Sequence, residues 1–360
     1  MIAKDEARNI ARALDSVKPL VDYVLIEDTG STDGTQQIVN DWLQTNGING
    51  DVVEEPWQDF AYNRSHALSQ LRGNAAVDYA LMLDADDKLV IKDDPISIKK
   101  DLAIDCYAIP IHHGNLRHRR AQLCNNRKPF RYRGVVHEFL HCDEPFQQAH
   151  LDSLSIQVVG GGVRGRDLAV YHHDAEMLEH ELANGAEADL KPRYQFYLAQ
   201  SYRDAREPEK ALAAYLQRAE MHNGWIEEIY VALINAGRLM AQLEFSFVKM
   251  LAIWRRAIDL IPRRAEAYHG AAVACRNAGC LHEALDFARR GLIRLQPEGL
   301  FIEPWIYDWG LLDEYAVAAY WCNFPAECLT ACRAILGKEI DSRTRARIEK
   351  NAEFAIRTIH

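Results

Sequence analysis

Several features that would assign a chain to a large functional class are missing from this sequence of 360 residues. Its eight cysteines include no Cys-x-x-Cys pair, which argues against a zinc ribbon. Their number does not require disulfides, so a reducing compartment is the simpler expectation. No run approaches the roughly 18 apolar residues of a membrane helix. These absences exclude a disulfide scaffold and an integral membrane protein.

An excess of positive charge is also missing. The formal net charge of −10 argues against a general nucleic-acid binder, which is normally basic. Charged residues stand within Met1–Glu6, unlike the start of a signal peptide. We therefore expect a cytoplasmic protein with no nucleic-acid partner. The length allows about two domains.

The first half alternates apolar runs with helical spacing. We expect strands at 23–26, 51–55, 79–83 and 106–109, and helices at 5–17 and 36–44. The loop Glu27–Thr35 joins a strand to a helix and contains Gly, Ser and Thr. Its backbone N–H groups and the following helix N-terminus suit an anion, as in a nucleotide-binding βαβ unit. An ordinary capped turn is the alternative.

The expected strand at 79–83 ends in Asp84-Ala85-Asp86. Ligands of open α/β sheets bind beyond the carboxyl ends of the strands. Two carboxylates at such an end share one hard divalent cation, which keeps phosphate oxygens as further ligands. A solvated acidic turn is the competing interpretation of so short a pattern.

Four motifs together resemble family 2 glycosyltransferases of the GT-A fold. They are Lys4-Asp-Glu-Ala-Arg-Asn9, Asp28-Thr-Gly-Ser-Thr-Asp-Gly-Thr35, Trp57-Gln-Asp-Phe60 with Asn63-Arg64, and Leu83-Asp-Ala-Asp86. The resemblance implies a nucleotide-sugar donor, with UDP favoured over GDP, a Mn²⁺ or Mg²⁺ ion, and inversion at the anomeric carbon. It also implies a shortened first strand, since few residues precede Lys4.

The same resemblance implies roles for individual residues. Asp28 is expected beside the nucleobase and Arg64 near the base or the phosphates. Asp84 is expected near the ribose or the metal, and Asp86 as a metal ligand.

A second chemical centre follows in Tyr132-Arg-Gly-Val-Val-His-Glu-Phe-Leu140. Val135 and Val136 fit a strand, and Gly-x-x-His-Glu recurs in relatives that carry a helical tail. An inverting transfer needs a base to take the acceptor proton, and we assign Glu138. We expect Arg131 or Arg133 to keep that carboxylate ionised. His137 is a third metal ligand, an acceptor contact or a core histidine.

Two basic segments are candidates for binding an anion. Residues 112–133 are rich in His and Arg and face the donor or acceptor, or else form a solvated hairpin. Residues 158–167 hold three consecutive glycines with Arg164 and Arg166. That loop closes over the diphosphate with Arg164 as a donor contact, or it is a linker between domains.

The second half contains helical patterns only. Repeated Ala and Tyr positions, with Pro262 and Pro297 closing two units, match the paired helices of tetratricopeptide repeats. The sequence thus predicts an α/β GT-A domain with a mixed sheet at 1–173 and an all-α tetratricopeptide-like domain at 174–360. Such a tail holds a protein or glycan acceptor, mediates a homodimer or buttresses the first domain.

The leading hypothesis is a metal-dependent inverting glycosyltransferase. A nucleotidyltransferase is the first alternative, although residues 5–9 lack the glycine that its loop requires. A non-catalytic repeat scaffold with a degenerate transferase domain is the second, against which the joint presence of Asp28, Asp84, Asp86 and Glu138 argues.

Overall fold

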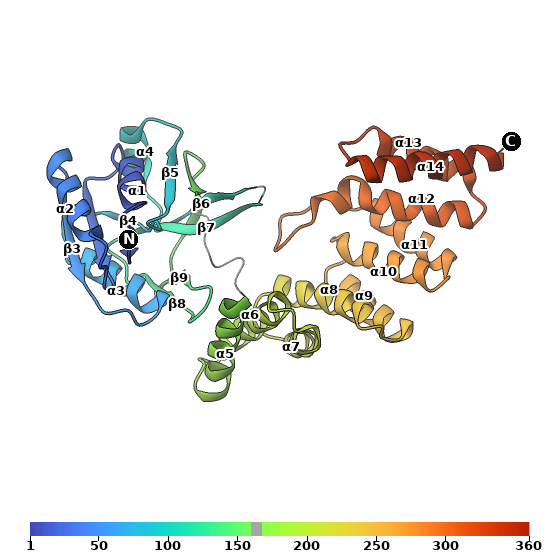
Figure 1. The fold of residues 1–360 in the computed structure, drawn as a ribbon, viewed down its shortest axis with the longest axis horizontal. Coiled ribbons are helices and arrows are strands. Elements are labelled where there is room, and N and C mark those ends of the chain that lie inside the picture. Colours follow the sequence, from blue (N-terminus) through green and yellow to red (C-terminus); the bar gives the residue numbers. More distant parts are fainter. Residues whose placement is uncertain (115, 160–167, 360) are drawn as a thin grey trace. The chain divides into compact units, whose positions relative to one another are not determined.

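The computed structural model describes residues 1–114, 116–159 and 168–359. The chain divides into two compact units, Met1–Asp167 and Leu168–His360 (Figure 1). The boundary expected after His173 lies inside helix α5 (Leu168–Asn184), so the helical unit begins six residues earlier. The prediction of an α/β domain followed by an all-α domain is confirmed.

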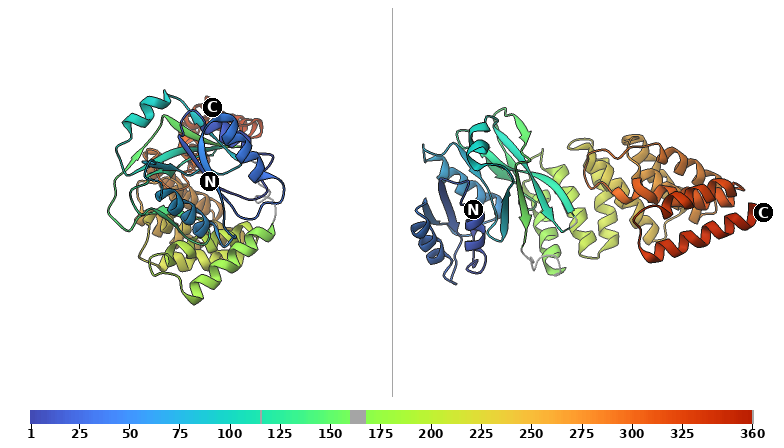
Figure 2. Two further views of the ribbon diagram at one scale, coloured as in Figure 1. Left: turned by 90° about the vertical axis from the view of Figure 1, so that its left-hand side faces the viewer. Right: turned by 90° about the horizontal axis from the view of Figure 1, so that it is seen from above.

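The first unit contains two principal sheets, best separated in Figure 2. A parallel sheet has the order β1 (Ile2–Ala3), β2 (Tyr23–Asp28), β3 (Asn49–Glu54). A mixed sheet has the order β4 (Tyr79–Leu81), β7 (Leu116–Asn125), β6 (Cys106–His113), β11 (Leu154–Val158), β5 (Asp87–Ile91), with β10 (Gln148–His150) on β6. Strands β8 (Arg131–Arg133) and β9 (Phe139–His141) form a separate pair. The expected mixed α/β architecture is therefore present.

Helix α1 (Ile10–Val17) belongs to the cores of both sheets. Its side chains Ile10 and Leu14 pack with β2 and α2 (Thr35–Asn46), whereas Ala13 and Val17 pack with the mixed sheet. All four are buried, as their spacing predicts. The other helices of this unit are α3 (Phe60–Arg72) and α4 (Pro95–Asp101).

The strand expected at Val135–Val136 is not formed. Gly134 has φ 106° and His137 has φ 53°, and both values are incompatible with an extended strand. The segment between β8 and β9 is instead a loop. Glu138 consequently emerges from a bent loop and is followed by β9, rather than ending a strand.

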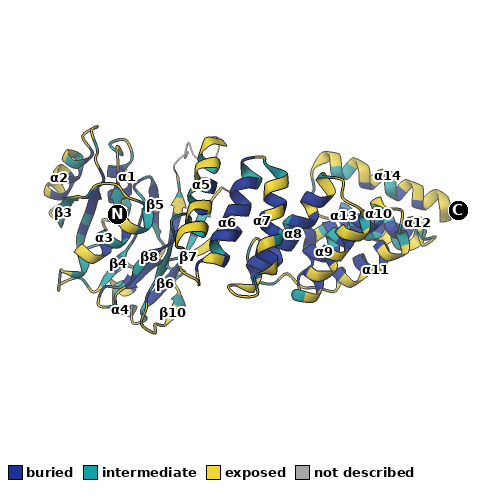
Figure 3. Ribbon diagram, turned by 90° about the horizontal axis from the view of Figure 1, so that it is seen from below, coloured by how far each residue is buried: buried dark blue, intermediate teal, exposed yellow. Residues whose placement is uncertain are grey.

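The second unit is a series of antiparallel helices, each packed against the next (Figure 2). After α5 come α6 (Lys191–Asp204), α7 (Pro208–Glu220), α8 (Ile226–Gln242), α9 (Phe247–Leu260), α10 (Glu266–Asn277), α11 (Leu281–Leu292), α12 (Leu311–Trp321), α13 (Pro325–Leu336) and α14 (Ser342–Ile359). Residues 192–297, all of them described, contain no strand. This bears out the tetratricopeptide-like assignment. Figure 3 shows α8 buried over most of its surface and α14 largely exposed, as expected of a terminal cap.

Small residues let neighbouring helices approach closely around one tryptophan. Trp254 of α9 is 3% exposed and lies against Gly237 of α8 and Gly270 of α10. A Cβ built on Gly270 would stand 2.4 Å from Cζ3 of Trp254, so no other residue fits without displacing the ring. The two glycines therefore allow α9 to pack closely against α8 and α10.

Arginine–carboxylate pairs connect successive helical hairpins. Residues 36 to 38 positions apart are joined in Arg256–Glu220, Arg264–Glu227, Arg276–Glu314 and Arg289–Glu327. Arg264 is 1% exposed and also binds Glu266, with its guanidinium 4.4 Å from the Tyr230 ring centroid. The spacing of these pairs matches one repeat, so each pair ties one hairpin to the next.

Candidate active site

Asp28 ends β2 and is the first element of the candidate site. Its Oδ1 accepts hydrogen bonds from the backbone N–H groups of Gly30 (3.0 Å) and Ser31 (2.8 Å) and from the Gln36 side chain (3.1 Å). Burial raises its pKa, but the bonds from Ser31 and Gln36 outweigh burial and bring the pKa below the ordinary value. Its Oδ2 is buried with no partner among the described residues. A buried carboxylate oxygen of this kind needs a hydrogen-bond donor from outside these side chains, either water or a ligand.

The loop after β2 is fastened to the segment after β1. The backbone N–H of Asp5 donates to Ser31 Oγ at 2.9 Å, and that of Glu6 donates to Thr35 Oγ1 at 2.8 Å. Asp5 has φ 53°, an uncommon conformation for a residue other than glycine. Its carboxylate in turn accepts from the Thr32 backbone at 2.7 Å. The two loops therefore hold each other beside Asp28.

Arg64 is the fifth residue of α3 and begins the second turn of that helix. The Asp59 side chain accepts from the Tyr62 backbone N–H at 2.7 Å and caps the helix. Arg64 is 5% exposed, and its guanidinium lies 5.7 Å from the Phe60 ring centroid and 5.5 Å from that of Tyr132. With these two rings beside it, the guanidinium group has its terminal N–H groups directed towards carboxylates.

The two arms of Arg64 hold two carboxylates that the sequence separates widely. One terminal nitrogen lies 2.5 Å from Asp84 Oδ1 and the other lies 2.8 Å from Glu138 Oε1. Burial lowers the pKa of Arg64, but the charges of Asp84 and Glu138 raise it above its ordinary value. Arg64 stays charged and places the predicted donor-binding acid and the predicted base in one cluster.

Asp84 to Asp87 form the turn between β4 and β5, closed by a bond from the Asp87 backbone N–H to the Asp84 carbonyl (3.1 Å). Burial raises the pKa of Asp84, whereas Arg64 and then Arg120 lower it to below the ordinary value. Burial, followed by the charges of Asp84 and Asp86, raises the pKa of Asp87 to about 7. Negative charge is therefore crowded at this turn.

The carboxylate oxygens at this turn are of the kind that binds a divalent cation. Asp86 is half-buried, and its carboxylate forms no ion pair with any residue within the described ranges. Its backbone carbonyl accepts from Arg12 at 2.8 Å, which fixes the turn. Carboxylate oxygens are preferred ligands of Mg²⁺, which adds phosphate oxygens and water to few protein ligands. Asp84 and Asp86 are the carboxylates available at this turn, and the two oxygens of Asp84 face Arg64 and Arg120.

His137 does not complete this pair into a three-residue metal site. The described part of the chain contains no group of three His, Cys, Asp or Glu side chains that could hold a metal ion. The φ angle of 53° at His137 turns the backbone between Val136 and Glu138. The Glu138 carboxylate is joined to the cluster by Arg64.

Glu138 also has a partner that its sequence neighbours did not suggest. Arg131 pairs with Asp143 at 3.1 Å, and Glu138 pairs with Arg64 instead. Sequence proximity suggested the arginines at 131 and 133, because residues close in the chain are the first candidates for a local ion pair. A contact over 74 positions carries no local signal in the sequence.

Two further residues complete the surroundings of the site. Arg120 on β7 is a member of the basic segment 112–133 and lies 3.5 Å from Asp84 Oδ2 in the acidic turn. Glu27 has a fully buried side chain that accepts from Asn63 Nδ2 at 2.9 Å and contacts His66 Nδ1 at 2.7 Å. It anchors α3 to β2. Glu27 was overlooked because its neighbour Asp28 carries the motif. Arg164 and Arg166 lie outside the described residues.

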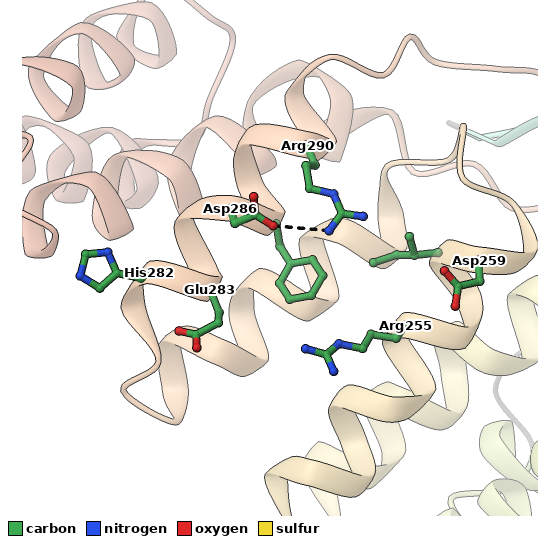
Figure 4. A pocket seen from close by; sticks show the side chains of 8 residues that line it. Arg255, Asp259, His282, Glu283, Asp286 and Arg290 are labelled. Atoms are coloured by element: carbon green, nitrogen blue, oxygen red, sulfur yellow. Dashed lines mark hydrogen bonds and ion pairs between the residues drawn. The ribbon is translucent and has the colours of Figure 1, made fainter.

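The helical unit has a pocket of its own, of about 470 Å³. It lies between α9 and α11, and Figure 4 shows the mixed charges of Arg255, Asp259, Glu283 and Arg290 around it. Asp286 and Arg290 are 3.4 Å apart within it. None of the motif residues described above lines this pocket. No helix within the described ranges is both long and apolar enough to span a membrane.

The first part of the chain is similar to known proteins. Residues 1–95 match the family described as Glycosyl transferase family 2. An uncharacterized glycosyltransferase of Rickettsia felis is 36% identical over 89 residues, which are 25% of this chain and 28% of that protein. A TPR repeat-containing protein of Synechococcus elongatus is 34% identical over 93 residues, 26% of this chain and 21% of that protein. The matches thus span about a quarter of each relative.

Among solved structures, similarity is found to proteins that include a TPR protein. BtubC from P. vanneervenii is 10% identical with a TM-score of 0.42, over 55% of this chain and 84% of that one. YrrB, described as a TPR protein with an unusual peptide-binding site, is 15% identical with a TM-score of 0.34, over 54% of this chain and 92% of that one.

Proposed function

Given a first unit that carries a family 2 glycosyltransferase segment at residues 1–95, we propose that this protein transfers a sugar, with inversion, from a nucleotide-sugar to an acceptor. The observation that carries the proposal is that Arg64 forms ion pairs with both Asp84 and Glu138. Its terminal nitrogens lie 2.5 Å from Asp84 Oδ1 and 2.8 Å from Glu138 Oε1. It gathers an acid from the donor-binding turn and a carboxylate suited to general base catalysis at one place.

The donor's nucleoside end binds beside Asp28. Its buried Oδ2 lacks a partner among the described residues, and a carboxylate only accepts hydrogen bonds. A base with a ring N–H, such as uracil or guanine, satisfies this oxygen, and we propose UDP over GDP as the donor nucleotide. Asp84 and Asp86 would hold a Mn²⁺ or Mg²⁺ ion, which would offset the charge of the diphosphate.

The reaction proceeds by in-line displacement. The acceptor hydroxyl oxygen forms a bond to the anomeric carbon while the bond from that carbon to the phosphate oxygen breaks. Glu138 takes the hydroxyl proton, and the nucleoside diphosphate leaves with the bonding electron pair. Arg64 lies 2.8 Å from Glu138 Oε1 and so holds this carboxylate in place beside the donor-binding turn.

The acceptor is proposed to be a protein or a glycan bound with the help of the helical unit. Stacked helical hairpins present extended surfaces that suit such ligands. Incubation with a radiolabelled nucleotide-sugar, followed by separation of protein from free glycan, distinguishes the two classes by which fraction gains label.

The transferase activity is tested on a panel of UDP- and GDP-sugars, with and without Mn²⁺ or Mg²⁺. We expect release of the nucleoside diphosphate from at least one UDP-sugar, and we expect chelation of the metal to stop it. Release of pyrophosphate from a nucleoside triphosphate plus a sugar phosphate would identify a nucleotidyltransferase instead. A chain that neither binds nor turns over any donor would be a scaffold.

A further inference from the structure

Arg64 is held in a manner that differs from that of a ligand-binding arginine. Its side chain is 6% exposed, whereas that of Arg120, on the other side of Asp84, is 35% exposed. Both terminal nitrogens face protein carboxylates, at 2.5 and 2.8 Å. Phe60 and Tyr132 contact the guanidinium as well. A group so enclosed has little surface left for a nucleotide.

The carboxylates held by Arg64 come from distant parts of the chain. Asp84 lies in the turn between β4 and β5, and Glu138 lies in the bent loop between β8 and β9. The strand before that loop, β8, is attached to the same helix, since Ser65 Oγ accepts from the Tyr132 backbone N–H at 2.8 Å. Consecutive residues of α3 therefore hold β8 through Ser65 and Glu138 itself through Arg64.

We propose that Arg64 is a positioning residue that sets the distance and orientation of Glu138 relative to the donor-binding turn at Asp84, and that it does not contact the donor. The inference rests on the proposed glycosyltransferase function. Only a planar, forked cation bridges two carboxylates in this way, because a lysine ammonium is a single point charge. The sequence resemblance by contrast implies a direct donor contact for Arg64.

The two roles predict opposite effects of Arg64→Lys. A positioning role predicts that the affinity for UDP, measured by calorimetry with Mg²⁺, and the KM for the nucleotide-sugar stay at the wild-type values. It predicts a fall in kcat of about 100-fold, the typical cost of a misplacement of about 1 Å. A donor contact predicts weaker UDP binding and a raised KM.

Chemical rescue provides a second readout. Arg64→Ala leaves space between Asp84 and Glu138, and we expect added guanidinium at millimolar concentration to restore part of kcat, whereas methylammonium restores none. Arg127→Ala is the matched control, because Arg127 pairs with Asp78 at 3.0 Å on the surface and reaches neither carboxylate. Its activity should equal wild type and should not respond to guanidinium.

A crystal structure of Arg64→Lys supplies a readout that does not depend on activity. We expect the Glu138 carboxylate to move relative to Asp84 while α3 stays in place, with circular dichroism showing that the variant is folded. An unmoved Glu138, or UDP affinity that falls together with an unchanged kcat, would overturn the positioning role. Failure of wild type to turn over any sugar nucleotide would contradict the proposed function, and the crystal structure and UDP affinity would still decide the role of Arg64.

Discussion

At the scale of single residues, the site is an arrangement of carboxylates with unequal surroundings. Glu138 is joined to Arg64, Asp84 is shared by Arg64 and Arg120, and Asp28 is held by backbone N–H groups on one oxygen only. We expect each of these three carboxylates to have a different role. The residue-scale predictions follow from these differences.

Glu138→Gln removes the proton acceptor but keeps the shape and a hydrogen-bonding oxygen for Arg64. We expect sugar transfer to slow by at least about 100-fold, since a general base contributes about 10² to 10⁴ in rate. Donor and metal affinity should stay normal by calorimetry. Transfer at the wild-type rate would remove Glu138 from the catalytic assignment.

Asp28→Asn replaces one carboxylate oxygen by an NH₂ group and tests the nucleobase contact. We expect UDP affinity to fall by about tenfold or more, because a hydrogen bond to a charged group contributes about 1.5–3 kcal/mol. Metal dependence should be unaltered. Asp41→Asn is the control, since Asp41 is exposed on α2 and pairs only with Gln37 among the described residues. Equal UDP affinity in both variants would place the nucleotide elsewhere.

Asp86→Ala tests the metal assignment. We expect it to abolish Mn²⁺- or Mg²⁺-dependent turnover and to leave the melting temperature close to wild type. Among the described residues, the bond that involves Asp86 runs from Arg12 to its backbone carbonyl, which alanine keeps. The metal dependence is measured by following turnover as the concentration of Mn²⁺ or Mg²⁺ is raised. Persisting activity that still requires metal would remove Asp86 from the ligands.

The local motifs indicated the acids of the candidate site, and the structure joins two of them, Asp84 and Glu138, through Arg64. Asp28 ends β2, whereas Asp84 and Asp86 lie in the turn after β4. The pairing of Glu138 with Arg64 was not predictable, because it depends on how α3 packs against the loop after β8. The metal role and the donor role of these acids stay predictions.

At the scale of elements, periodicity predicted most of the helices and strands, and backbone strain caused the clearest error. Apolar residues at 135 and 136 suggested a strand, yet positive φ angles at Gly134 and His137 on either side bend the chain. Hydrophobicity reports burial, and Val136 is indeed buried, but burial alone does not distinguish a strand from a packed loop.

The packing of Trp254 between Gly237 and Gly270 predicts the effect of a mutation on the stability of the helical unit. We expect Gly270→Ala to destabilise the helical unit by about 1–3 kcal/mol, the usual cost of overpacking. Alanine's better helix propensity, about 1 kcal/mol, offsets only part of this because the ring is too buried to move away. Urea unfolding followed by circular dichroism measures the change.

Gly185→Ala is the matched control for that measurement. An added Cβ at Gly185 meets no atom within 4 Å, so its unfolding midpoint should equal or slightly exceed that of wild type. Equal midpoints for the two variants would mean that α9 and α10 adjust without cost.

At the scale of the whole molecule, the chain has two units with separate cores. We expect two calorimetric unfolding transitions. UDP with Mg²⁺ should raise only the transition of the first unit, by about 2.7 kcal/mol of stabilisation when UDP is at 100 times its Kd. Gly270→Ala should lower only the other. A single transition that both treatments shift would show that the units unfold together.

The repeat-spaced arginine pairs have a consequence for how the length of this protein can change during evolution. Each pair joins positions 36 to 38 residues apart, as in Arg264–Glu227 and Arg276–Glu314. Inserting one residue within a helix turns everything after it by about 100°, which moves one partner of a pair to another face. A buried arginine left without its carboxylate costs about 3–5 kcal/mol. Insertions and deletions inherited within the helices should therefore come as whole hairpins, with single-residue changes confined to the connecting loops.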